Sequence, residues 1–233
     1  MDYQDRHVVV TGGTGALGVA VLEALLQAGA WCHVPYRGEQ AIERHPHRGN
    51  ARVSFVAAGD LADESTVTRY YEGLKDLWAS IHIAGAFASA PIARSDKALL
   101  MGQLESNLVS AYLCSRSAAL ALRRLGSGGR IVNVAARQAL EPRLGSGSVA
   151  YTIAKAGVAA LTTALGAELA GEGILVNAVA PSIMDTPGNR KAMPNADFAS
   201  WPKVEEVAAT ILFLASPANT VTRGAVVPVY GKA

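Results

Sequence analysis

Short apolar runs alternate with amphipathic stretches along the whole chain. The runs lie at residues 7–11, 30–35, 53–57, 80–84, 130–134, 174–180 and 225–229. Between them, apolar positions at helical spacing predict helices at residues 19–28, 65–78, 99–125, 148–169 and 204–215. Apolar strands joined by crossover helices are typical of a parallel sheet covered on both faces. We predict an α/β fold with one Rossmann-like, doubly wound parallel sheet, forming a single domain over residues 1–233.

The composition narrows the class of protein. The chain has 233 residues and a formal net charge of +2, and half of its residues are hydrophobic. Such a chain, without a long basic run, is not expected to bind nucleic acid. Its two cysteines, Cys32 and Cys114, lie far apart in apolar segments, as reduced core thiols do. No secretory signal and no segment long and apolar enough to span a bilayer is recognised, so a cytoplasmic protein without a membrane partner is predicted.

Three glycines follow the first strand in the stretch TGGTGALG, residues 11–18. Gly12, Gly15 and Gly18 permit positive φ and close approach of the backbone. The helix that begins here directs its free N–H groups and the positive end of its dipole at an anion. Glycine turns are common, so the stretch alone is weak evidence. Its place between a strand and a helix favours a dinucleotide pyrophosphate.

The end of the second strand bears on the choice of dinucleotide. An acidic residue at this place binds the ribose 2′-hydroxyl of NAD. Tyr36 and Arg37 stand here instead, and a guanidinium suits a 2′-phosphate, so NADP(H) is preferred over NAD(H). The alternative is that Arg37 is a solvated loop charge. His45 and His47 follow in a polar loop without further ligands nearby, so we interpret them as surface residues and predict no metal site.

Tyr151 and Lys155 lie four residues apart, which places them one turn from each other on one face of a predicted helix. Free tyrosine has a pKa of about 10, and a nearby positive charge favours the phenolate and lowers that pKa. Tyr151 can then donate a proton to a carbonyl or imine, or accept one from an alcohol. The same pair occurs on helices by chance, so its surroundings decide between catalysis and packing.

Several motifs occur in a fixed order: the glycine turn at 11–18, Asp60-Leu61, Ala84-Gly85, Asn107, Tyr151 with Lys155, and Pro181 with Thr186. In this order and at these separations they resemble the short-chain dehydrogenase/reductase family over essentially the full length. The resemblance implies that Asn107 holds a water of a proton relay and that Tyr151 and Lys155 complete the catalytic set. The cofactor-binding residues that it implies are Gly12, Thr14, Gly15, Ala16, Leu17, Gly18, Arg37, Asp60, Leu61, Ala84, Gly85, Tyr151, Lys155, Pro181, Met184 and Thr186.

The chain departs from the family at several positions. The family usually has a serine that hydrogen-bonds the substrate oxygen after the fifth strand, and the aligned position holds Ala136. A missing donor of this kind typically costs about 10²–10³ in rate. Ser146 or Ser148 in the following loop is a candidate replacement, although flexible polar loop residues are the simpler interpretation. Two further departures are His82-Ile83 in place of a pair of asparagines and Ser182 in place of glycine.

One branch of the family fits the missing serine better. The run DTPGNRKAMPNADFASW at 185–201 and the run ARQAL at 136–140 resemble the dihydropteridine reductases. By that resemblance, hydride passes to a quinonoid C=N system whose charge delocalises over a ring, so a hydroxyl at a developing alkoxide is less needed. Arg37 departs from this branch, which carries an acidic residue for NADH.

The segment 181–202 is long and mostly irregular, and loops of this length are often functional lids. Its larger apolar side chains would close over a flat substrate and exclude water. A static surface loop is the alternative, because Pro, Asn and Asp are turn formers. The lid side chains are Met184, Met193, Phe198 and Trp201, and the predicted substrate contacts are Ala136, Arg137, Met193 and Trp201.

The helix that carries Tyr151 is apolar nearly all round, so it is expected to be buried on more than one side. The family resemblance implies that the helices around Asn107 and Tyr151 pair with their copies, which predicts a homodimer or homotetramer.

Three functions stay open at this stage. The first is an NADPH-dependent oxidoreductase that transfers a hydride to a small-molecule carbonyl or imine, with Tyr151 as the proton donor. The second is the reduction of a quinonoid pterin or a related conjugated C=N substrate, as in dihydropteridine reductase. The third, from another class, is a catalytically silent module that binds NADPH as a sensor. The observation behind it is Ala136 at the position where the family has a serine.

Overall fold

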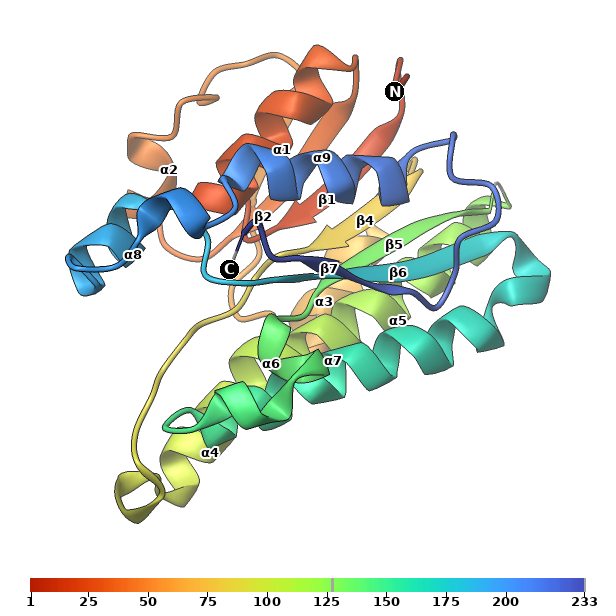
Figure 1. The fold of residues 1–233 in the computed structure, drawn as a ribbon. Helices are drawn as coiled ribbons and strands as arrows, with labels where there is room; N and C mark the ends of the chain where they lie inside the picture. The colour runs from red at the N-terminus through yellow and green to blue at the C-terminus, as the bar shows by residue number, and fades with distance from the viewer. Residues whose placement is uncertain (127, 233) are drawn as a thin grey trace.

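A computed structural model describes residues 1–126 and 128–232 and contains one seven-stranded parallel sheet (Figure 1). The strand order is β3-β2-β1-β4-β5-β6-β7, so the chain reverses direction across the sheet between β3 and β4. This order confirms the predicted doubly wound fold. The strands are β1 (His7–Thr11), β2 (Trp31–Tyr36), β3 (Val53–Ala57), β4 (Ala79–His82), β5 (Gly129–Val134), β6 (Ile174–Pro181) and β7 (Val226–Val229).

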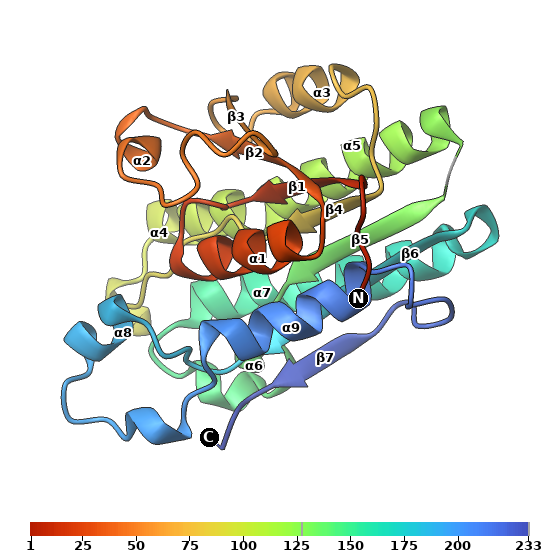
Figure 2. The same ribbon diagram turned by 90° about the horizontal axis from the view of Figure 1, so that it is seen from above.

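Helices cover both faces of the sheet, with α1 and α9 packed on one face and α3, α5 and α7 on the other (Figures 1 and 2). The α-helices are α1 (Ala16–Gln27), α2 (Gln40–Glu43), α3 (Glu64–Glu72), α4 (Lys97–Gln103), α5 (Ser110–Leu125), α6 (Arg137–Leu140), α7 (Val149–Glu168), α8 (Pro187–Ala192) and α9 (Val204–Ala215). A π-helical turn, η2 (Leu104–Val109), joins α4 to α5. Short 3₁₀ turns lie at Ile92–Arg94, Pro142–Gly145, Ala170–Glu172 and Phe198–Ser200.

The strands are apolar throughout because both faces of the sheet are buried. In β1, Val8 and Val10 belong to the core under α1 and α9, whereas Val9 belongs to the core under α3 and α5. This alternation follows from the two-residue period of a strand. Every residue of β5 and β6 is buried. Continuous apolar runs rather than alternating ones are the expected consequence.

The helix boundaries differ from the predicted ones where local signals are weak. The predicted helix at 99–125 is present, but η2 interrupts it. The predicted helix at 65–78 ends at Glu72, because Gly73 follows and the chain then turns toward β4. The predicted irregular segments at 135–147 and 181–202 contain the short helices α6 and α8. Cys32 and Cys114 are both buried free thiols, as predicted.

Helix α7 corrects one prediction. It is 20 residues long and apolar enough to cross a bilayer by length and composition, so the statement that no such segment exists was wrong. The helix packs against β6, α4 and α6, and Ala150, Ala154 and Val158 are buried there. These contacts bury one face of α7, and 39% of its apolar window is buried. The pattern of small residues lets α7 lie close to its neighbours.

The amino-terminal edge of the sheet is held by an aromatic ring between two guanidinium groups. The guanidinium carbons of Arg6 and Arg130 lie 3.8 and 4.9 Å from the centroid of the Trp78 ring. Trp78 Nε1 also donates a hydrogen bond to the Ala215 carbonyl oxygen at 2.9 Å. Cation–π contacts of this kind stabilise the edge where β4 and β5 begin.

Candidate active site

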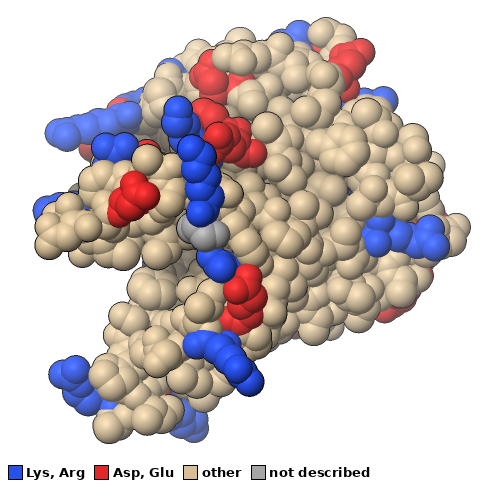
Figure 3. Space-filling view, in the orientation of Figure 1, with Lys and Arg blue, Asp and Glu red and all other residues tan. Residues whose placement is uncertain are grey.

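Two adjoining cavities lie at the carboxyl edge of the sheet, where the surface is hollowed between the part that carries α8 and the part that carries α4 and α6 (Figure 3). The first has a volume of about 230 Å³, the second about 210 Å³, and Gly85 and Ala86 line both. Predicted residues that line the first are Gly12, Thr14, Arg37, Asp60, Leu61 and Ala84. Those that line the second are Leu17, Asn107, Ala136, Tyr151, Lys155, Pro181 and Met184.

The glycine turn is packed so tightly that side chains are excluded from it. Gly12 has φ +68°, and a Cβ there would lie 2.6 Å from the backbone nitrogen of Ala84. A Cβ at Gly18 would lie 2.2 Å from the Gly12 carbonyl oxygen, so Gly18 serves the packing of α1 on the turn rather than lining a cavity. Gly15 caps α1, which begins at Ala16. The first N–H groups of α1 therefore face this edge, an arrangement that fits a pyrophosphate.

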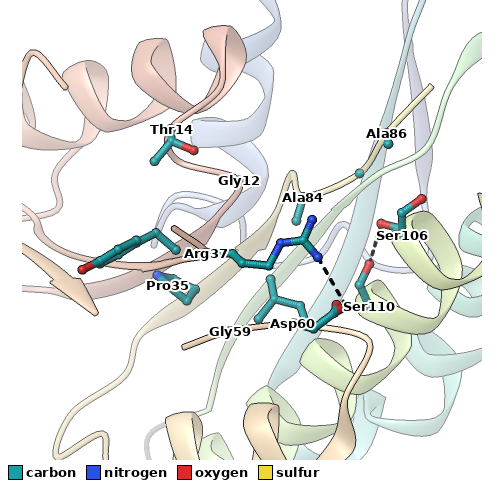
Figure 4. A pocket seen from close by; sticks show the side chains of 13 residues that line it. Gly12, Thr14, Pro35, Arg37, Gly59, Asp60, Ala84, Ala86, Ser106 and Ser110 are labelled. Carbon is teal, nitrogen blue, oxygen red and sulfur yellow. Dashed lines mark hydrogen bonds and ion pairs between the residues drawn. The ribbon is translucent and has the colours of Figure 1, made fainter. Parts of the chain in front are cut away.

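Arg37 and Asp60 both line the first cavity and their side chains meet there (Figure 4). The Arg37 Nη1 atom lies 3.4 Å from Asp60 Oδ2, and the two side chains are 75% and 59% exposed. Ion pairs this exposed contribute roughly 0–1 kcal/mol, so an incoming anion can compete for the guanidinium. Asp60 is oriented by the Ala62 N–H, which donates to its Oδ1 at 2.9 Å.

His45 is buried, which overturns its interpretation as a surface residue. Its Nε2 lies 3.1 Å from the Gly13 carbonyl oxygen, and its Nδ1 accepts a hydrogen bond from the His47 N–H at 3.2 Å. The imidazole is therefore neutral with its proton on Nε2, and burial lowers its pKa. His45 thus ties the segment after Arg37 to the back of the glycine turn. Sequence spacing carries no signal for this contact.

Tyr151 and Lys155 project from α7 into the second cavity. The Lys155 Nζ donates a hydrogen bond to the Val134 carbonyl oxygen at 2.8 Å and lies 5.8 Å from the centroid of the Tyr151 ring. Burial lowers the pKa of Lys155 to about 8. Burial also raises the pKa of Tyr151 to about 12, contrary to the predicted decrease, because the apolar surroundings disfavour the phenolate.

Asn107 lies in the π-helical turn η2 and carries an unpaired buried acceptor. Its Nδ2 donates to the carbonyl oxygens of Ala86 at 2.8 Å and Gln103 at 3.1 Å. Its Oδ1 has no hydrogen-bond partner among the described residues. This oxygen lies beside Gly85, where a Cβ would be 2.5 Å from Oδ1 and 3.6 Å from the Lys155 Nζ. A buried acceptor without a protein partner calls for a bound water or ligand.

His82 forms the centre of a buried polar network beneath the cavities. Its Nδ1 lies 2.8 Å from Asn133 Oδ1, and its Nε2 lies 2.8 Å from Ser80 Oγ. Asn133 in turn donates to Thr162 Oγ1 at 3.0 Å. Burial lowers the pKa of His82 to about 4, so the ring is neutral at neutral pH. The network fixes the ends of β4 and β5 against α7, which carries Tyr151.

Neither loop serine replaces the hydroxyl that Ala136 lacks. Ala136 lines the second cavity, whereas Ser146 and Ser148 do not, and the Ser148 Oγ donates to the Gly145 carbonyl oxygen at 3.3 Å. Among the described residues that line this cavity, Tyr151 and Ser182 carry hydroxyl groups. The Ser182 hydroxyl donates to the Tyr230 carbonyl oxygen at 2.9 Å, so its proton is already engaged.

Several predicted contacts lie outside both cavities. Thr186 caps α8 by accepting a hydrogen bond from the Asn189 N–H at 3.1 Å. Trp201 is buried with its ring centroid 5.1 Å from that of Phe198, and Met193 ends α8. Of the predicted lid side chains, Met184 alone lines a cavity among the described residues. The predicted substrate contact Arg137 is likewise placed outside them, against the ring of Tyr230.

Phe87 was not predicted to lie at the site. Its ring meets the Tyr151 ring edge to face, with centroids 5.0 Å apart, and the residue is 63% exposed. The sequence feature that could have identified it is its position as a single aromatic residue within the run of small residues after Gly85. Phe87 therefore forms an apolar wall next to the phenol.

Known proteins and one family model resemble this chain over most of its length. The family model for short chain dehydrogenases matches residues 6–197. Galactitol 2-dehydrogenase of Rhizobium johnstonii is 32% identical, and the match covers 98% of this chain and 97% of the relative. Cis-4-hydroxycyclohexanecarboxylate dehydrogenase of Sinomonas cyclohexanicum is also 32% identical, with 98% and 96% covered.

Solved structures share the fold. An oxidoreductase of the short chain dehydrogenase/reductase family from Burkholderia thailandensis has a TM-score of 0.87 and 26% identity, with 98% of this chain and 92% of that chain covered. The structure titled "ElxO with NADP Bound" has a TM-score of 0.88 and 24% identity, with 98% of each chain covered. At the lower identity, the likeness bears on the fold alone.

Proposed function

Because the chain belongs to the short-chain dehydrogenase/reductase family, we propose that this oxidoreductase uses NADPH and transfers a hydride to a carbonyl or imine of a small molecule. One observation carries the proposal: Tyr151, Lys155 and the unpaired Oδ1 of Asn107 meet in a cavity that adjoins the glycine turn. The glycine turn, Arg37 and Asp60 would hold the dinucleotide, because Gly12, Arg37 and Asp60 line the first cavity and α1 begins at this edge. When bound, the nicotinamide supplies or accepts the hydride.

The residues of the second cavity would move the proton. Tyr151, with a pKa of about 12, is protonated at neutral pH and donates to the substrate oxygen or nitrogen. Lys155, with a pKa of about 8, is mainly charged at neutral pH and favours the phenolate that this donation leaves. Asn107 would hold the water that returns a proton from solvent.

The test of this mechanism is Tyr151→Phe. The variant is expected to lose turnover of carbonyl and imine substrates while still binding NADPH, because the ring remains and the proton donor is gone. Tyr112→Phe, at an exposed tyrosine on α5, is the matched control and should keep its activity. Retention of most of the rate in Tyr151→Phe would contradict the proposed role.

The preference for NADPH rests on Arg37. Its exposed guanidinium lines the first cavity and is held by a weak ion pair that a 2′-phosphate can displace. We expect Arg37→Asp to weaken NADPH binding far more than NADH binding, as measured by fluorescence titration of each cofactor. Equal weakening of the two would remove this assignment and leave Arg37 as a solvated charge.

A conjugated C=N substrate, such as a quinonoid pterin, is the second candidate. The observation that favours it is that, among the described residues lining the second cavity, Tyr151 alone carries a hydroxyl that is not engaged elsewhere, so no second hydroxyl donor assists it. A charge that delocalises over a ring needs such a donor less than a developing alkoxide does. Rates with quinonoid dihydropterin and with simple ketones, each with both cofactors, would separate the two. The two relatives are named as dehydrogenases of galactitol and of cis-4-hydroxycyclohexanecarboxylate, and both of these compounds are alcohols. Their names therefore support a carbonyl substrate over a C=N substrate.

A catalytically silent NADPH-binding module is the candidate from another class. The observation behind it is the missing hydroxyl at Ala136. Firm NADPH binding without oxidation of NADPH across ketones, quinones and quinonoid dihydropterin would favour it. The arrangement of Asn107, Tyr151 and Lys155 in one cavity supports the enzyme instead.

We also propose a cytoplasmic homodimer or homotetramer that forms through α5 and α7. Leu120 and Tyr112 on α5 and Ile153 on α7 expose 46%, 52% and 48% of their surface, although they are large and apolar or aromatic. A groove of about 410 Å³ runs between the same helices. Exposed apolar surface of this kind marks an interface. Sedimentation of a monomer at micromolar concentration would contradict the assembly.

A further inference from the structure

Ser182, in the wall of the second cavity, is bonded to the end of β7 by both its backbone and its side chain. Its N–H donates to the Val229 carbonyl oxygen at 3.2 Å, and its Oγ donates to the Tyr230 carbonyl oxygen at 2.9 Å. The position of this wall therefore depends on where the chain runs after β7.

The Tyr230 ring also contacts Arg137, which follows the cavity-lining residue Ala136. The guanidinium carbon of Arg137 lies 4.7 Å from the centroid of the Tyr230 ring. Glu141 holds the same guanidinium, with its carboxylate oxygens 3.1 and 3.3 Å from Arg137 Nε and Nη2. Arg137 is the first residue of α6 and directly follows Ala136, which lines the cavity. Tyr230 thus connects the Ser182 wall to the Ala136 wall.

Residues 230–232 are fixed in turn to the end of the segment 181–202. The Lys232 N–H donates to the Ser200 carbonyl oxygen at 2.9 Å. Gly231 has φ +66°, and a Cβ there would lie 2.7 Å from the Pro202 nitrogen and 2.8 Å from the Ser200 oxygen. A side chain does not fit at this position, because both close neighbours are backbone atoms.

From these contacts we infer that Tyr230 is a positioning residue that fixes Ala136 and Ser182, which line neighbouring parts of the second cavity. Its ring contacts Arg137, the residue after Ala136, and its carbonyl oxygen accepts a hydrogen bond from Ser182. None of its described contacts reaches the glycine turn, Arg37 or Asp60, so we expect NADPH binding to be preserved when the ring is removed. The inference rests on the proposed function, since it assigns the substrate to the part of the cavity that Ala136 and Ser182 line.

Tyr230→Ala tests the inference in the full chain, with whichever carbonyl or imine substrate the wild type reduces in a Tyr151-dependent manner. The expected result is a KM for that substrate raised about 10- to 100-fold, with kcat less affected and the Kd for NADPH unchanged. Tyr230→Phe keeps the ring under Arg137 and loses only the hydroxyl that interacts with Glu141, so its KM should rise less than that of Tyr230→Ala. Gly231→Ala, which displaces the backbone instead of removing the ring, should reproduce the effect of Tyr230→Ala.

Lys232→Ala is the matched control, because it removes an exposed side chain and keeps the backbone bond to Ser200. Ser182→Ala removes the bond to the Tyr230 carbonyl oxygen, which Tyr230→Ala keeps, so it tests the second contact of residue 230 and should raise KM on its own. An unchanged KM in both Tyr230→Ala and Gly231→Ala, or parallel increases in KM and the NADPH Kd, would overturn the inference. A wild type without any turnover would count against the proposed function itself, whereas loss of turnover in Tyr151→Phe alongside an unchanged KM in Tyr230→Ala would overturn only the positioning role.

Discussion

Lys155 is buried and Tyr151 is half-buried at the ends of the strands, where bulk water solvates neither ionised form well. The pKa of the phenol is raised to about 12 and that of the ammonium is lowered to about 8. The two groups are therefore driven toward their neutral forms, and the hydrogen bond from Lys155 to the Val134 carbonyl oxygen partly offsets the cost for the cation.

The lowered pKa of Lys155 has a consequence for stability. Between the folded value of about 8 and the ordinary value of 10.5, the unfolded chain binds more protons, so the free energy of unfolding rises with pH. The rise attributable to this group is about 3 kcal/mol over that window. Lys155→Met should lack it in urea denaturation at pH values from about 7 to about 10. Lys191→Met, at an exposed lysine, should keep it. The same rise in both variants would contradict the burial effect.

Two glycines should respond to alanine with opposite signs. Gly12→Ala places a Cβ 2.6 Å from a backbone nitrogen at φ +68°, so it should lower the free energy of unfolding by about 1–2 kcal/mol or more. Gly102→Ala, inside α4 with no atom within 4 Å of its Cβ, should raise it by about 0.5–1 kcal/mol. Chemical denaturation measures both. A stabilising Gly12→Ala would contradict the tight packing of the turn.

At the scale of elements, the predictable part of the fold is the part that a local pattern encodes. Strands β1 and β3 and helix α9 have the predicted bounds, because each is an apolar run or a periodic stretch between clear breaks. The π-helical turn at Asn107 is too short for its different period to stand out from the two helices that it joins, so the predicted helix ran through it. The motif residues around the two cavities were predictable from their order. The roles of His45, Phe87 and Tyr230 depend on contacts between distant segments, which no spacing encodes.

The contact of His45 with the glycine turn gives a prediction at this scale. His45→Ala removes the Nε2 donor to the Gly13 carbonyl oxygen and should weaken NADPH binding about three- to tenfold, because the turn loses support from behind. His45→Gln can donate from its amide and should bind more like the wild type. Fluorescence titration with NADPH measures both variants. Equal weakening in the two would show that the imidazole acts through its bulk alone.

At the scale of the whole molecule, the candidate active site and the structural contacts around Trp78 lie at opposite edges of the sheet. Both cavities lie at the carboxyl edge, beside the point where the strand order reverses, as expected for doubly wound sheets. The exposed apolar faces of α5 and α7 lie on one side of the sheet, so an assembly through them leaves the carboxyl edge accessible (Figure 1).

The assembly can be tested by placing charge on that face. Leu120→Glu or Ile153→Glu should shift the sedimentation coefficient toward the monomer, because a carboxylate buried in an apolar interface lacks a partner. Val221→Glu, at a loop residue that is 78% exposed, is the control and should sediment like the wild type. Identical sedimentation of all three variants would place the interface elsewhere.

The arrangement of Trp78 between Arg6 and Arg130 lies at the edge opposite both cavities. Changes there should alter stability rather than the reaction, since no described contact of these three residues involves a cavity-lining side chain. Libraries that search for stability can therefore be built at this edge, separately from libraries at the carboxyl edge that alter substrate scope. The two libraries should combine with little interference, because the residues they vary share no partners.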